Sequence, residues 1–200
     1  MTDVELIRSS VDEFIRPERS LPDTLVLELI ALSVCEFSHN AAPIQIRVVL
    51  EGPTHGFIED SGRGMRMEPD EGDEISHAER ALTSIYPIAA GNAQVQQLLT
   101  DNIWGPRGSQ GPVLANALSS AYVFQSRRNG EVWEQCYRRG VPEDPPCLVG
   151  ATDRTGTTVR FLVDSSLAPN QTFSETKLTT LLNTLTHQIP NLEITLPRVS

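Results

Sequence analysis

The chain has 200 residues, 39% of them hydrophobic, and a formal net charge of −10. This size and apolar content suit one globular domain with a core of its own, and they are too small for two comfortable domains. The negative charge opposes attraction to a phosphate backbone, because such binding rests on Lys and Arg. We therefore expect no direct contact with nucleic acid.

No apolar run is long enough to span a membrane, and the N-terminus lacks the basic flank and apolar core of a secretory signal. The cysteines form no CxxC pair and the histidines are scattered singly. Neither a disulfide framework nor a zinc site is supported. We expect a cytoplasmic protein that does not contact a membrane.

Helical patterns and one hairpin occupy the first half of the chain. The segments "IQIRVVL" (44–50) and "HGFIED" (55–60) predict two strands joined by the tight turn "EGPT". Apolar residues at three- and four-residue spacing predict a first helix that ends at Arg16-Pro17. The predicted helices of this half cover 4–15, 24–37, 75–85 and 93–99.

The second half is richer in strands. A Gly-rich segment leads into a short helix over 113–120, and a helix over 174–187 is followed by a closing strand over 192–196. Between them, turns at Asn129-Gly130 and Thr155-Gly156 predict an antiparallel meander. Its strands are 121–127, 131–138, 147–153 and 157–163. Helices and strands are segregated enough to predict a two-layer α+β sandwich.

One acidic residue, Glu28, lies within the otherwise apolar stretch "TLVLELIALSVCEF" (24–37). A helix that is hydrophobic all round is buried, and an ionised carboxylate there is costly unless it is paired, hydrogen-bonded or wet. A partly exposed carboxylate at a helix edge is the simpler interpretation, because Glu is seldom fully buried. Two further carboxylates favour a second interpretation: Glu36 lies two helical turns on, and Asp60 ends a strand. In that interpretation Glu28 is a general base near a cleft, and desolvation raises its pKa.

Two glycine-bearing segments are candidate binding loops. In "IEDSGRGM" (58–65), Asp60 precedes glycines that permit close backbone approach, so it can accept a hydrogen bond from a ligand amino group. An ordinary Asx turn is the alternative. In "WGPRGSQGPVLANALS" (104–119), Pro112 stands at the expected start of a helix, which is the layout of an anion site. A solvated loop explains that segment equally well.

Together and in this order, these segments resemble the N-terminal ATPase domain of DNA gyrase B and topoisomerase IV, in the gyrase, heat-shock-90, histidine-kinase and mismatch-repair (GHKL) ATPase superfamily. "LVLELIALSVCE" is similar to the first family motif, L-V-x-E-x-x-x-N-S-x-x-E, and "DSGRGMR" to the second, D-D-G-R-G-I-P. The resemblance runs from Arg16-Pro17 to the C-terminus. Its further matches are "MEPDEG" (67–72), "NALS" (116–119), "RGVP" (139–142) and "TGTTVRF" (155–161).

The resemblance implies the Bergerat (GHKL) fold, with a mixed, mostly antiparallel sheet covered on one face by helices. Residues 1–200 would form a single gyrase-B-like ATP-binding domain without the transducer and DNA-gate domains. The resemblance implies that Glu28 is the general base and that Asp60, Gly64 and Thr157 surround adenine. It implies that Glu36 pairs with Arg63, and that Arg63, Met65 and Arg128 lie at the pocket mouth, where family members contact aminocoumarin inhibitors. The phosphate lid would contain Gly105, Gly108 and Gly111.

The departures from the family gather at the triphosphate end. Leu32 stands where the family has the Asn that ligates Mg²⁺, and leucine offers no oxygen to a metal that requires near-octahedral oxygen ligation. We therefore expect no metal ligand there, which calls Mg²⁺ binding into question. Asn92 replaces a phosphate-directed lysine, and Pro106 and Ser109 stand at lid positions where glycines are expected.

Phosphoryl transfer is catalysed mostly by positioning and charge neutralisation, so these departures should cost turnover more than adenine recognition. The favoured interpretation is a domain that binds ATP or another adenine nucleotide with weak or absent hydrolysis. One alternative is a functional ATP-hydrolysing type II topoisomerase ATPase domain. The other is a non-catalytic paralogue that binds a protein partner and keeps a vestigial pocket. An adenine-site inhibitor is a further expected ligand.

Overall fold

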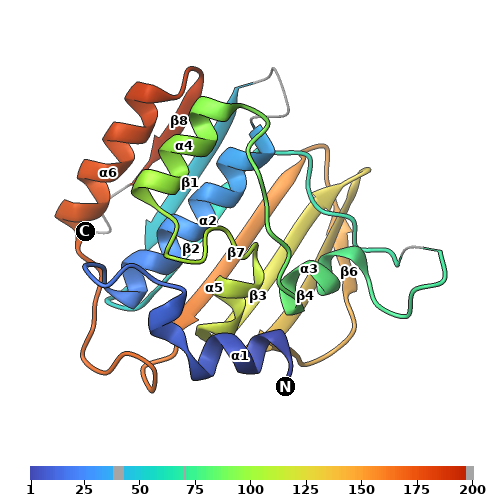
Figure 1. Cartoon of the computed structure of the whole chain (residues 1–200). Helices are drawn as coiled ribbons and strands as arrows, with labels where there is room; N and C mark the ends of the chain where they lie inside the picture. Colours follow the sequence, from blue (N-terminus) through green and yellow to red (C-terminus); the bar gives the residue numbers. More distant parts are fainter. Residues whose placement is uncertain (38–42, 70, 197–200) are drawn as a thin grey trace.

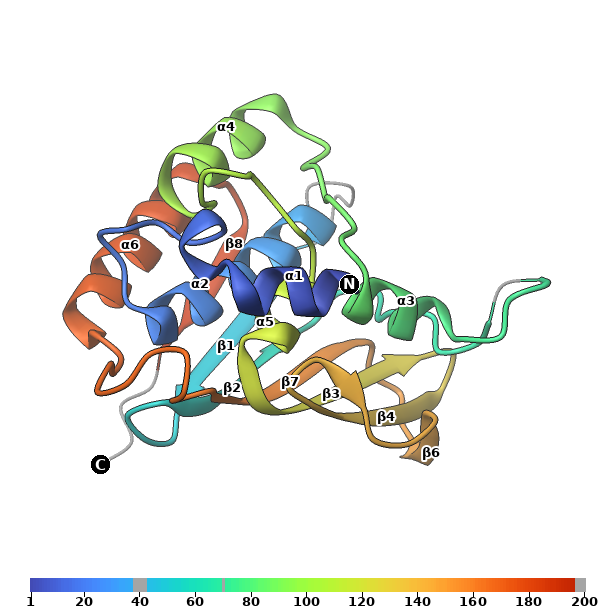
Figure 2. The same ribbon diagram turned by 60° about the horizontal axis from the view of Figure 1, so that its bottom comes forward.

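A computed structural model describes residues 1–37, 43–69 and 71–196. These residues form an eight-stranded sheet with helices on one face, so the molecule has two layers (Figures 1 and 2). The α+β fold class predicted from the sequence is confirmed. The strands are β1 (Ile44–Leu50), β2 (His55–Asp60), β3 (Ser119–Arg128), β4 (Glu131–Arg138), β5 (Val141–Pro142), β6 (Cys147–Ala151), β7 (Gly156–Val163) and β8 (Leu192–Thr195).

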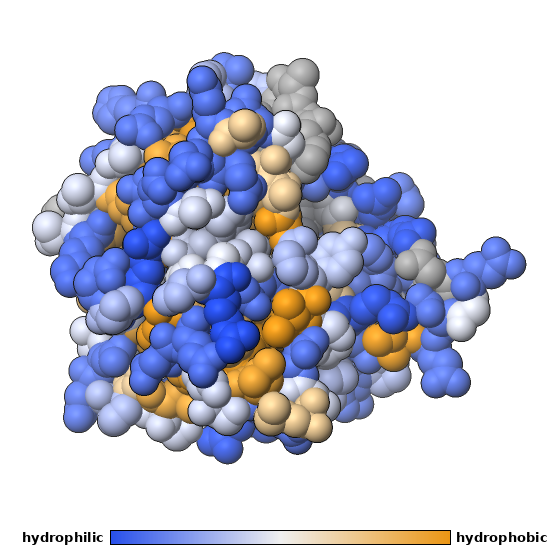
Figure 3. Space-filling model, viewed as in Figure 1, coloured by the Kyte–Doolittle hydropathy of each residue, from blue (hydrophilic) through white to orange (hydrophobic). Residues whose placement is uncertain are grey.

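The helices are α1 (Asp3–Ser9), the 3-10 turn η1 (Val11–Glu13), α2 (Leu21–Phe37), α3 (His77–Thr83), α4 (Ala93–Asn102), α5 (Val113–Ala117) and α6 (Glu175–Gln188). Of the described residues, no helix is long and apolar enough to cross a membrane. Figure 3 views the helical face and shows its hydrophobic surface as separate patches bordered by hydrophilic residues.

The sheet order is β5-β4-β3-β7-β2-β1-β8, with β6 paired to β4. The hairpin of β1 and β2 has the predicted bounds, and β8 runs parallel to β1, which makes the sheet mixed. The predicted meander is wrong in one respect, because β7 lies between β3 and β2 instead of following β6. Residues 159–163 of β7 alternate between buried and exposed, as expected for a sheet with one face covered by helices, whereas all five residues of β6 are exposed.

The first predicted helix, 4–15, is also wrong as one continuous element. Helix α1 begins with a capping box between Thr2 and Glu5 and ends at Ser9, and Ser10 leaves the helical conformation before η1. The break turns the chain so that Phe14 reaches the core, where it is 1% exposed. Helix α5 is likewise shorter than predicted, because β3 already begins at Ser119.

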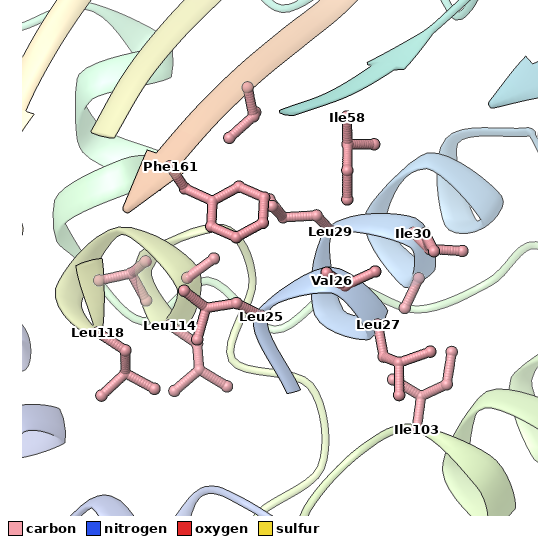
Figure 4. Close-up of a cluster of buried hydrophobic side chains, with 14 of the residues drawn as sticks. Leu25, Val26, Leu27, Leu29, Ile30, Ile58, Ile103, Leu114, Leu118 and Phe161 are labelled. Carbon is pink, nitrogen blue, oxygen red and sulfur yellow. The ribbon is translucent and has the colours of Figure 1, made fainter. Parts of the chain in front are cut away.

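Helix α2 lies between the sheet and the other helices, which explains why it is apolar on nearly every side. In Figure 4 its Leu29 lies beside Ile58 and Phe161 of the sheet, while Leu25 faces Leu114 of α5. Most of its residues are fully buried. Each such Leu or Ile contributes about 2 kcal/mol of hydrophobic stabilisation, so α2 is the centre of the core.

Candidate functional site

A cavity of about 530 Å³ lies between α2 and the inner face of the sheet. Its walls come from α2, from β2 and the loop that follows it, from α3, and from β3 and β7. The cavity brings together most of the residues singled out in the sequence: Leu32, Glu36, Asp60, Arg63, Gly64, Met65, Arg128 and Thr157.

Asp60, at the end of β2, is the centre of a hydrogen-bond network in this cavity and is 7% exposed. Its Oδ1 accepts from the amides of Gly62 at 2.8 Å and Thr157 at 3.2 Å. Its Oδ2 accepts from the hydroxyls of Thr157 and Ser33, the latter at 3.2 Å. Four donors hold the carboxylate in one orientation, at the junction of α2, β2 and β7.

The Ser33 hydroxyl has two acceptors and one proton. Besides Asp60, it reaches the main-chain oxygen of Leu29 at 3.3 Å. When the hydroxyl donates to Leu29, a lone pair of Asp60 Oδ2 becomes available to a ligand. Ser33 was not assigned a role from the sequence, although it belongs to the first motif. A polar residue within the apolar stretch of α2 is the signal that could have identified it.

Gly64 shapes the cavity through its backbone. Its φ is +73°, and a Cβ there would lie 2.4 Å from the main-chain oxygen of Arg127, so a side chain does not fit. The loop is held to β3, because Ser126 Oγ accepts from the Met65 amide at 2.8 Å and donates to the Met65 carbonyl at 2.7 Å. Arg128 Nη1 donates to the Gly64 carbonyl at 3.0 Å.

Arg63 and Glu36 form a two-point ion pair at the cavity edge. Nε donates to Oε1 at 2.5 Å and Nη2 donates to Oε2 at 2.9 Å. This hydrogen bonding raises the pKa of Arg63 above its usual value. Tyr86 and His77, which no sequence motif marked, also line the cavity and meet edge to face, with ring centroids 6.5 Å apart.

Glu28 lies elsewhere. It is 1% exposed, it is absent from the residues that line the cavity, and neither carboxylate oxygen has a hydrogen-bond partner among the described residues. Burial raises the pKa of Glu28 to about 8, and the charge of Arg19 offsets this only in part. In this arrangement Glu28 is largely protonated at neutral pH and does not face the cavity.

The glycine-rich segment is folded onto the N-terminal turn. A Cβ at Gly105 would lie 2.0 Å from the Phe14 carbonyl, and the Gly108 amide donates to Gly105 O at 3.0 Å. Arg107 forms an ion pair with Glu13, and its guanidinium lies 5.0 Å from the ring centroid of Phe14. Gly105, Gly108 and Gly111 do not line the cavity here, whereas Pro112 does.

Among the described residues that line the cavity, only Glu36 and Asp60 carry a carboxylate, a ligand that Mg²⁺ prefers. Leu32 lines the cavity without an oxygen, Glu36 is paired with Arg63, and Asp60 is occupied by four donors. Within 1–37, 43–69 and 71–196, no group of three acidic, His or Cys residues is arranged to hold a metal ion. Asn92 instead caps α4, accepting from the amides of Gln94 and Val95.

Comparisons with known proteins identify the family and the fold of the chain. DNA gyrase B of Staphylococcus aureus is 30% identical over 146 residues, which are 72% of this chain and 21% of that protein. DNA gyrase B of Thermotoga maritima is 29% identical over 151 residues, 74% of this chain and 23% of that protein. The chain therefore spans about a fifth of the length of these curated relatives. No family model matches.

Among solved structures, the topoisomerase IV ATP-binding domain of Francisella tularensis, in complex with a small-molecule inhibitor, superposes with a TM-score of 0.76 at 20% identity. The superposition covers 97% of this chain and 88% of that one. The fold is thus the GHKL ATPase fold. The sequence matches show that the chain belongs to the DNA gyrase B family, and its fold is that of the topoisomerase IV ATP-binding domain.

Proposed function

We propose that residues 1–200 act as one gyrase-B-like domain that binds an adenine nucleotide in the cavity and hydrolyses it weakly or not at all. The observation that carries the proposal is the Asp60 network: a buried carboxylate, oriented by Gly62, Thr157 and Ser33, at the wall of a cavity of about 530 Å³. Rotation of the Ser33 hydroxyl toward Leu29 opens a lone pair for the adenine amino group.

The shape and charge of the walls support a flat, aromatic ligand. Ile58, Phe124 and Val159 supply apolar surface next to Asp60, and Gly64 lets a ring approach the backbone. A small set of polar groups within apolar walls is typical of cofactor sites. At the mouth, Arg63 and Arg128 would contact the polar part of a nucleotide or of an adenine-site inhibitor.

The residues at the triphosphate end of the site support weak or absent hydrolysis. Glu28 is buried away from the cavity, Gly105 of the lid segment packs on the Phe14 carbonyl, and Leu32 stands where a metal ligand would be required. A general base must reach the proton that it removes. We also propose that the domain is cytoplasmic, makes no direct contact with nucleic acid and can bind a protein partner.

Isothermal titration with a non-hydrolysable ATP analogue, with and without Mg²⁺, tests this function. We expect binding that does not depend on Mg²⁺, and at least tenfold weaker binding by Asp60→Asn, because an amide replaces one acceptor oxygen with a donor. A separate assay measures phosphate release from ATP. Release that requires Mg²⁺ and is lost in Glu28→Ala would establish an ATP-hydrolysing domain instead. Failure of the folded wild type to bind any adenine nucleotide would indicate a vestigial pocket.

A further inference from the structure

Arg127 of β3 contacts Asp60 and Thr157, the residues proposed to bind adenine, from the face of the sheet opposite the cavity. Side chains alternate along a strand, and Tyr122, Phe124 and Arg128 of β3 line the cavity, so Arg127 lies on the opposite face. Its side chain is nevertheless only 9% exposed. A buried guanidinium on the uncovered face of a sheet needs specific partners, because burying an unpaired charge is costly.

Those partners are the main chains of the two residues at the centre of the site. Arg127 Nη2 donates to the carbonyl oxygen of Asp60 at 3.1 Å and to that of Thr157 at 3.0 Å. Nη1 donates to Thr158 Oγ1 at 2.5 Å, and Glu59 Oε1 lies 3.3 Å from Nη2. One side chain therefore ties β3 to β2 and to β7, at the point where β2 ends with Asp60 and β7 begins next to Thr157.

We propose that Arg127 is a positioning residue that sets the geometry of Asp60 and Thr157 and thereby the preference of the site for an amino-bearing purine. This inference rests on the proposed function. Fixing the two carbonyls fixes the backbone from which the Asp60 carboxylate and the Thr157 hydroxyl project. Gly156 allows this close approach, since a Cβ there would lie 1.9 Å from Asp60 O.

The positions of Asp60 and Thr157 determine which purine the site prefers. An adenine ring presents an amino donor to Asp60, whereas a hypoxanthine ring presents an oxygen that the carboxylate repels. A site built to hydrogen-bond one group rejects an analogue that lacks it, provided that the site's own groups hold their positions. Loss of Arg127 should therefore reduce the preference for adenine over hypoxanthine, whereas a merely structural role would lower stability and leave the preference unchanged.

The test compares binding of ATP and of inosine triphosphate by titration without Mg²⁺. We expect the wild type to prefer ATP by about tenfold or more. Arg127→Met, which keeps an unbranched apolar stem but no donor, should reduce the preference to threefold or less, and Arg127→Lys should restore part of it. The matched control is Arg160→Met, because Arg160 lies on the same outer face, where it pairs with Glu51 and lies over the Phe57 ring, away from Asp60 and Thr157.

Hydrogen exchange of the ligand-free protein gives a second measurement. The Gly62 and Thr157 amides, which donate to Asp60 Oδ1, should exchange at least several-fold faster in Arg127→Met than in Arg160→Met. If Arg127→Met does not fold, Thr158→Val replaces it, since it removes one acceptor of the guanidinium.

An unchanged nucleotide preference together with unchanged exchange overturns the positioning role. If the wild type binds neither nucleotide, the proposed function fails. The exchange rates then still decide whether Arg127 holds this part of the site: faster exchange in Arg127→Met supports that role, and rates equal to those of Arg160→Met refute it.

Discussion

Glu28 and Leu32 lie one turn apart on α2, yet only Leu32 lines the cavity. Glu28 is buried among apolar side chains and has no hydrogen-bond partner among the described residues. The carboxylate and the cavity are therefore separated in this arrangement, and catalysis by Glu28 would require α2 or its neighbours to move. Substitutions of Glu28 and of Leu32 test these two positions separately.

Replacing Glu28 should stabilise the protein at neutral and higher pH. Burial raises the pKa of Glu28 from 4.5 to about 8, so between these values the unfolded chain loses a proton that the folded protein keeps. Wild-type stability then falls as pH rises from 4.5 to 8. The free energy of unfolding of Glu28→Gln, measured with urea, should exceed the wild-type value by about 4 kcal/mol at pH 8 and converge with it at about pH 4.

Exposed Glu68 serves as the control for that experiment, because Glu68→Gln should follow the wild-type pH dependence. A difference between Glu28→Gln and the wild type that does not grow with pH would contradict the buried, protonated state of Glu28.

Replacing Leu32 with Asn should create a dependence on Mg²⁺. The change places an amide oxygen in the cavity wall, and oxygen is the ligand that Mg²⁺ prefers. We expect Mg²⁺ to strengthen binding of a non-hydrolysable ATP analogue by about fivefold or more in Leu32→Asn, and not in Leu32→Ala or the wild type. Equal Mg²⁺ responses in all three proteins would show that Leu32 does not determine metal binding.

Asp164 should make stability depend on pH in the acid range. Burial by itself would raise the pKa of Asp164, but hydrogen bonds from Ser166 and Arg8 outweigh it and lower the pKa to about 2. The stabilisation is present above pH 3.8 and is lost as pH falls through 2. Arg8 donates at 2.7 Å and Arg139 lies 3.1 Å away, so Asp164→Asn should cost about 3 kcal/mol at pH 7.

The same unfolding titration at pH 2 should reduce the difference between Asp164→Asn and the wild type. Glu143→Gln, which breaks the exposed pair with Arg138, should change stability by less than about 1 kcal/mol. A cost for Asp164→Asn that persists at pH 2 would place the loss in packing and not in charge pairing.

The ion pair of Glu13 and Arg107 should protect the glycine-rich segment from protease. Because both side chains are about half exposed, the pair holds the segment weakly. Glu13→Gln should speed tryptic cleavage after Arg107 by about two- to fivefold, since cleavage follows the population of the open segment. Glu18→Gln, which breaks the pair of the exposed Glu18 with Arg16, is the control and should leave that cleavage unchanged. Equal cleavage rates in the two variants would mean that other contacts hold the segment.

The sequence by itself determined the features that depend on local patterns. Alternation and turn residues placed β1 and β2 at their observed bounds, and the apolar run with one carboxylate marked α2 as a buried helix. The order of the motifs identified the fold, because several short patterns with fixed chemistry rarely occur together by chance. Ser10 carries no breaking signal, so the helix over 4–15 was predicted as continuous.

Only the tertiary structure decided what depends on distant partners. The place of β7 between β2 and β3, the separation of Glu28 from the cavity, and the hydrogen bonds of Arg127 to Asp60 and Thr157 join residues far apart in the chain. A side chain's partners follow from how strands and helices pack, and packing minimises the energy of the whole core and not of any one segment.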